Sequence, residues 1–63
     1  MNKVQLRDEA KDLLLKGCYK MAYNKYCRLI EAGSEGFTAR EWAIVHLNQG
    51  ISLQFMEQFE KAI

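Results

Sequence analysis

The residues best suited to catalysis or metal binding are one histidine and two cysteines, and they stand apart in the sequence. His46 has no cysteine, second histidine or suitably spaced carboxylate around it, so it lacks the setting of a catalytic base or a metal ligand. Cys18 and Cys27 match no zinc spacing, and we expect both to be reduced, partly buried thiols. Glycine-rich phosphate loops, HExxH and Ser/His/Asp sets are also absent from the sequence. The sequence therefore predicts no enzymatic activity, no metal and no cofactor.

Charge and composition restrict the class of protein further. The chain has 63 residues, which is at most one domain of marginal stability, and its 9 basic and 8 acidic residues are interspersed to a net charge of +1. This balance gives no electrostatic footprint for nucleic acid or for an anionic membrane. Purely apolar runs such as Leu13 to Leu15 are far shorter than the roughly 20 residues that span a bilayer. With no signal-peptide core after Met1, we expect a cytoplasmic protein.

Two helices separated by a glycine are predicted in the first half of the chain. Asn2 and Gln5 have the spacing of a capping box, so a helix is expected to start near Lys3. Its apolar stripe is Leu6, Ala10, Leu13 and Leu14. Gly17 is expected to end it, since glycine takes the left-handed conformation without a steric cost.

The second helix is predicted over about 19–32, with Gly33 closing it. Its apolar stripe is Tyr19, Ala22, Tyr26 and Leu29, flanked by Tyr23, Cys27 and Ile30. A face this broad needs two neighbouring elements. Ala22 is small, so we expect it to let the axes of the first two helices approach closely.

A third helix is predicted from Ala39 onward, after a loop over 33–36. Thr38 and Glu41 have capping-box spacing, and Phe37 is placed to pack on Trp42 as a hydrophobic staple. The apolar stripe of this helix is Ile44, Leu47, Ile51 and Phe55, with Gly50 and Leu53 beside it. The sequence leaves two alternatives for the end of this helix: the chain turns near Glu57, or the helix continues to Ile63.

The sequence also repeats itself. A shift of 40 positions pairs small with small, aliphatic with aliphatic and aromatic with aromatic residues: Ala10 with Gly50, Leu13 with Leu53, Tyr19 with Phe59, and Ala22 with Ala62. This pattern resembles the tetratricopeptide repeat, a helix-turn-helix unit of about 34 residues. The matching residues are Ala10, Gly17, Tyr19, Ala22 and Tyr26 in the first repeat, and Gly50, Phe59 and Ala62 in the second. The departures are Leu6 and His46 for an aromatic, Ser34 for proline and Glu57 for the turn glycine.

The resemblance implies an all-α fold of antiparallel helical hairpins, a fragment of an α-α superhelix. One module would cover 1–63, with a first repeat at about 3–33 and an incomplete second repeat at about 38–63. The longer period is similar to that of the immunophilin and co-chaperone branches of the family. Three helices plus the start of a fourth, or an extension of the third in its place, are expected.

The resemblance also implies a partner-binding surface on the first helix of each hairpin. In the co-chaperone branch, a basic residue and asparagines on these helices clamp the acidic C-terminal tail of a heat-shock chaperone. Arg7 falls on the clamp lysine, Lys11 on its asparagine and Asn48 on the asparagine of the next repeat, and His46 and Gln49 are placed to line the same surface. The resemblance thus implies a protein-interaction module in a chaperone-associated or assembly-scaffold setting, unless these side chains are only solvated helix residues.

A rival interpretation is a structural self-association unit. The second helix has a broad apolar face, the second hairpin lacks its second helix, and no breaker interrupts Phe55 to Ile63. These features would suit a homodimer in which the long third helix of one copy completes the hairpin of the other.

Overall fold

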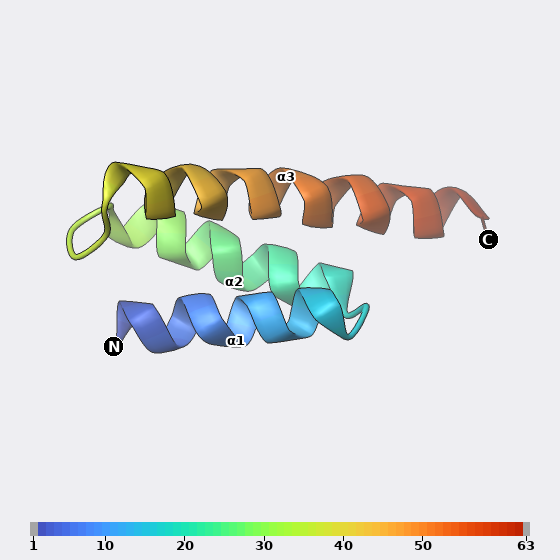
Figure 1. Cartoon of the computed structure of the whole chain (residues 1–63). Helices are drawn as coiled ribbons and strands as arrows, with labels where there is room; N and C mark the ends of the chain where they lie inside the picture. The colour runs from blue at the N-terminus through green and yellow to red at the C-terminus, as the bar shows by residue number, and fades with distance from the viewer. Residues whose placement is uncertain (1, 63) are drawn as a thin grey trace.

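The chain folds into three α-helices that lie side by side. α1 spans Lys3–Leu15, α2 spans Tyr19–Ala32 and α3 spans Ala39–Ala62, in a computed structural model that describes residues 2–62 and the side chains of residues 2–58. α1 and α2 form an antiparallel hairpin, and α3 packs along the other side of α2, antiparallel to it (Figure 1). The all-α hairpin fold expected from the sequence is confirmed, and the broad apolar face of α2 has its two neighbours.

The turn between α1 and α2 is built on Gly17. Its φ of +85° lies in the left-handed region, and its N–H donates to the Leu14 carbonyl at 3.2 Å while the Cys18 N–H donates to the Leu13 carbonyl at 2.9 Å. These two bonds form a Schellman motif, which satisfies carbonyls that the end of a helix would otherwise leave unpaired. The predicted helix end is confirmed, and α2 begins only two residues after this glycine.

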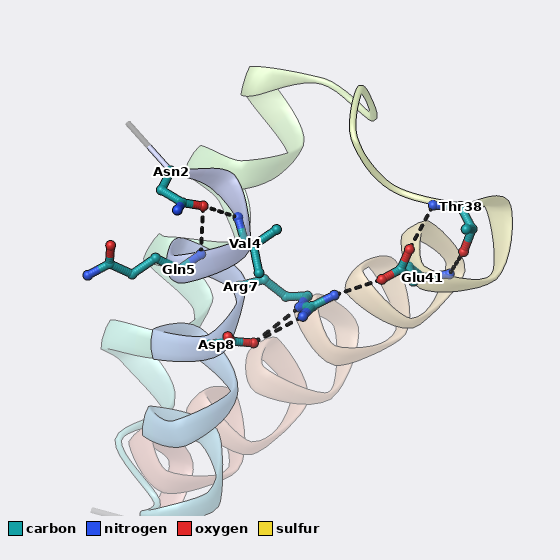
Figure 2. Close-up of polar contacts among 7 residues, drawn as sticks. All are labelled: Asn2, Val4, Gln5, Arg7, Asp8, Thr38 and Glu41. Carbon is teal, nitrogen blue, oxygen red and sulfur yellow. Dashed lines mark hydrogen bonds and ion pairs between the residues drawn. The ribbon is translucent and has the colours of Figure 1, made fainter.

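Only half of the predicted capping box forms at the start of α1. The Asn2 side-chain oxygen accepts from the N–H groups of Val4 at 3.0 Å and Gln5 at 3.2 Å (Figure 2). The Gln5 amide does not reach back to Asn2, because it donates instead to the Glu9 carboxylate one turn later, at 3.3 Å. The N-cap is confirmed, and the return bond of the box is not formed.

The start of α3 shows both halves of its capping box. The Glu41 N–H donates to the Thr38 hydroxyl at 3.1 Å, and the Thr38 N–H donates to the Glu41 carboxylate at 2.9 Å (Figure 2). The ring centroids of Phe37 and Trp42 are 5.8 Å apart, as a hydrophobic staple requires. These contacts fix the direction in which the chain enters α3.

The buried core draws on all three helices. Its members are Leu6, Ala10, Ala22, Tyr26, Leu29 and Val45. The stripes predicted for α1 and α2 supply all of them except Val45, and Leu13 and Leu14 pack against them partly buried. Ala10 and Ala22 are both fully buried, as expected of small residues where two helices approach closely.

Most of the apolar stripe predicted on α3 lies outside the face that packs on α2, although Phe55 stacks on Tyr19 of α2. Val45 and Ser52 are the fully buried residues there, and the Ser52 hydroxyl is satisfied by the Asn48 carbonyl at 2.8 Å. A small side chain with a satisfied hydroxyl lets α3 lie close to α2. The residues Ile44, Leu47, Ile51 and Phe55, called the α3 stripe below, lie beside this contact face, and three of them are more than a third exposed.

α3 continues without a turn to Ala62, so the second of the two open alternatives describes the structure. Glu57, where the first repeat has its turn glycine, is an exposed residue inside the helix. Tyr19, the first residue of α2, stacks on Phe55 with ring centroids 5.0 Å apart, and α3 extends past this end of the hairpin (Figure 1). The side chains of the repeat residues Phe59 and Ala62, and all of Ile63, lie outside the described residues.

Candidate functional site

A groove between α1 and α3, floored by α2, gathers most of the residues predicted to bind a partner. Its pocket has a volume of about 280 Å³. Residues from all three helices line this α1–α3 groove: Arg7, Asp8, Lys11, Tyr26, Glu41, Ile44, Val45 and Asn48. Arg7, Lys11 and Asn48 are therefore brought together as expected, although they come from helices that are far apart in the sequence.

Arg7 is engaged by carboxylates of the chain itself. Its guanidinium bonds Glu41 Oε2 at 2.9 Å and Asp8 Oδ1 at 3.1 Å, and it lies over the Phe37 ring, 5.7 Å from the centroid. Figure 2 shows the side chain crossing from α1 to the first turn of α3. The bond to Asp8, its charge and then Glu41 raise the pKa of Arg7. Arg7 therefore joins the two walls of the groove and is not a free cation for a ligand.

Contacts with Thr38 and with Arg7 stabilise the charged form of Glu41. The Thr38 backbone N–H is the main cause that lowers the pKa of the Glu41 carboxyl, followed by the Thr38 hydroxyl and then Arg7. One carboxylate oxygen serves the helix cap and the other accepts from Arg7. The cap of α3 and the α1–α3 ion pair are thus one connected network.

Asn48 is held in place by a hydrogen bond to a core residue. Its Nδ2 donates to the Tyr26 hydroxyl at 3.2 Å, and the Tyr26 residue is fully buried. Burial raises the pKa of the Tyr26 phenol, and the Asn48 bond and the Arg7 charge lower it in part. An amide has a second N–H and a carbonyl oxygen, so Asn48 keeps donor and acceptor capacity for a ligand in the groove.

Lys11 is the groove cation that is available to a ligand. Its side chain is exposed, and it forms no ion pair with any residue that the structure describes. It lies one helical turn after Arg7, on the same side of α1. An incoming carboxylate would meet Lys11 first, because Arg7 is already bonded to Asp8 and Glu41.

His46 and Gln49 lie elsewhere. His46 is exposed on α3 and meets the Trp42 ring edge-on, with centroids 5.4 Å apart. The Gln49 amide donates to Cys27 Sγ on α2 at 3.3 Å. Neither lines the α1–α3 groove, because rotation along the helix carries both away from Asn48. The placement of these two residues expected from the resemblance is therefore wrong.

Three contributors to the groove were not foreseen in the sequence. They are Glu41, which pairs with Arg7, the Tyr26 hydroxyl and the exposed side chain of Ile44. Glu41 had only its local role as a capping residue in the sequence analysis. Opposite charges on the two helices that line one surface are the signal that could have identified this pair.

Other kinds of site find little support in the described part of the chain. No group of three or more His, Cys, Asp or Glu side chains there could hold a metal ion. Cys18 and Cys27 are free thiols. Cys27 is partly buried as expected, whereas Cys18 is exposed, so the burial expected for Cys18 is wrong. None of the described helices combines the length and the apolar character that crossing a bilayer requires.

Comparison of the chain with family models, with curated proteins and with solved structures found no match. The likeness to tetratricopeptide repeats therefore rests on the residue pattern alone.

Proposed function

We propose that this chain is a tetratricopeptide-like protein-interaction module that binds a segment of a partner protein in the α1–α3 groove. The observation that carries the proposal is the pocket of about 280 Å³ between the two helices, with Lys11, Asn48 and the apolar Ile44 along its walls. The family resemblance supports it, because such repeats bind partners on the surface formed by the first helices of successive hairpins. A cytoplasmic co-chaperone or assembly-scaffold setting, with an acidic chaperone tail as partner, belongs to the same proposal.

The groove offers polar and apolar contacts side by side. Lys11 supplies a positive charge, and Asn48 supplies a donor and an acceptor that the Tyr26 bond holds in place. Ile44 is 48% exposed at the same wall, so an apolar side chain of the partner would be covered there. Such a mixture of a few fixed polar groups with apolar wall is typical of binding sites.

Peptide binding tests this proposal. A fluorescein-labelled peptide that ends in acidic residues should bind, and Lys11→Ala should weaken it by up to about fivefold at low salt, since an exposed ion pair contributes up to about 1 kcal/mol. Asn48→Ala should also weaken it, and Arg7→Ala should do less than Lys11→Ala because Arg7 is already paired. Fluorescence anisotropy gives the Kd values.

Lys20→Ala is the matched control, because Lys20 is an exposed lysine on α2 that does not line the groove. Circular dichroism should show equal helix content in all variants. If Lys11→Ala and Asn48→Ala both leave the affinity unchanged, the groove does not clamp a carboxylate.

Self-association is a second candidate function, and the unbroken course of α3 favours it. α3 runs on past the stacked pair Tyr19 and Phe55, where neither α1 nor α2 lies alongside (Figure 1). A second copy that packs there would give a dimer. The average mass measured by sedimentation would then rise with protein concentration. Glu57→Gly should favour monomer, since glycine in a helix interior costs about 1 kcal/mol relative to alanine and allows a turn; a dimer that persists in this variant would exclude helix exchange.

A further inference from the structure

The α3 stripe is the most prominent apolar feature that the fold leaves open. Ile44 is 48%, Leu47 61% and Phe55 40% exposed, and Ile51 is partly buried. Ile44 precedes the buried Val45 by one residue, so it is rotated by about 100° from the face that packs on α2. The stripe borders the α1–α3 groove through Ile44, which lines it.

The stripe has the length and spacing of a helix-binding surface. Its members follow at intervals of three, four and four residues, so they form one ridge of about three turns and about 16 Å. The ridge of one helix packs against the groove between ridges of another, and amphipathic helices bind their receptors through anchors at this same spacing.

Two unpaired cations lie beside the stripe in the described part of the chain. Arg40 lies one turn before Ile44 on the same side of α3, and Lys11 stands across the groove on α1. Neither forms an ion pair with the residues that the structure describes, whereas the two acidic residues of the groove, Asp8 and Glu41, are both bound to Arg7. Lys11 and Arg40 are therefore the charged side chains beside the stripe that no ion pair within the described residues engages, and they are available to carboxylates of a partner.

We propose that the occupant of the α1–α3 groove is an amphipathic helix of a partner protein, with apolar side chains on the α3 stripe and carboxylates facing Lys11 and Arg40. This inference rests on the proposed function and names its class of ligand. An extended acidic tail would satisfy Lys11, but it would leave Leu47 in water, because a chain without helical spacing does not follow the three-turn ridge. The helix covers both features at once.

Stapled peptides of about three turns test the inference, since short helices are only marginally stable alone. The first carries leucines at the spacing of the α3 stripe, flanked by glutamates. The second has the same residues in scrambled order, so that its leucines lie all around the helix. The third has lysines in place of the glutamates. The fourth probe is an unstapled, extended acidic peptide. Affinities come from anisotropy on the full chain.

The glutamate-flanked helix should bind, and Leu47→Glu should weaken it by at least about tenfold, because it puts a charge at the centre of the apolar contact. Leu15→Glu, at a residue 77% exposed and outside the groove, should change the Kd by less than about twofold. The double variant Lys11→Glu with Arg40→Glu should reverse the preference toward the lysine-flanked helix. Each variant replaces an exposed side chain, and circular dichroism checks its fold.

The contrary outcomes separate the two proposals. If the extended peptide binds better than the helix and Leu47→Glu has no effect on it, the groove binds a partner but the helical ligand is wrong. If the scramble binds as well as the patterned helix, the inference is also overturned. If neither the helices nor the extended peptide bind, the proposed function itself fails. A peptide-independent dimer that Leu47→Glu dissociates would make a second copy the occupant.

Discussion

Tyr26→Ala is expected to remove a large part of the stability of the protein. Tyr26 lies on α2 and is fully buried in the core, between the two neighbouring helices. Removing a large aromatic side chain from a core costs about 3–5 kcal/mol, whereas a 63-residue domain has a total stability on the order of 3–9 kcal/mol. The variant should lose most of its helical circular dichroism, or melt in far less urea than the parent.

The control for this change lies on the same helix. Met21 is 56% exposed, so Met21→Ala should leave the urea midpoint close to that of the parent. Tyr26→Phe keeps the ring and removes only the hydroxyl that Asn48 donates to, and it should be far milder than Tyr26→Ala. A folded Tyr26→Ala variant with an unchanged midpoint would show that α2 does not organise the core.

Ala22→Leu is expected to destabilise the chain by opening the contact between α1 and α2. Ala22 and Ala10 are both fully buried in the core cluster, and neither has free space at the surface to place a larger side chain. Overpacking a core costs about 1–3 kcal/mol and sometimes more, a large fraction of the stability of so small a domain. Urea unfolding, followed by circular dichroism and by the fluorescence of the single tryptophan, Trp42, measures the loss.

Ala43→Leu provides the matched change at an exposed position of α3. It adds the same atoms without a neighbour to displace, so its midpoint should stay close to that of the parent. Equal midpoints for Ala22→Leu and Ala43→Leu would mean that the α1–α2 contact has room for a leucine. That result would remove the packing basis for the small residues in the repeat pattern.

Two bonds couple the groove to the rest of the fold. Asn48 connects the groove to Tyr26, and Glu41 connects it to the cap of α3. A variant that changes peptide affinity through either residue can therefore also change stability. For this reason Lys11, which forms no ion pair within the described residues, is the cleanest position at which to test binding.

Local signals in the sequence determined where the helices begin, where the first two end and which faces of α1 and α2 are buried. Gly17, Asn2 and the Thr38–Glu41 pair act over three or four residues, so their effect does not depend on the rest of the fold. The stripes of α1 and α2 are read correctly for a similar reason, since each helix has one dominant apolar face.

Only the tertiary structure decided how α3 is rotated, which partner Arg7 takes and how far α3 continues. α3 has two candidate faces, and the one with Val45 and the small Ser52 packs on α2, which leaves the larger apolar stripe open. Arg7 meets Glu41, 34 residues away, only because the helices are packed side by side. Helix rotation and ion pairing depend on the shape of the facing helix, and the spacing of residues within one segment does not contain that information.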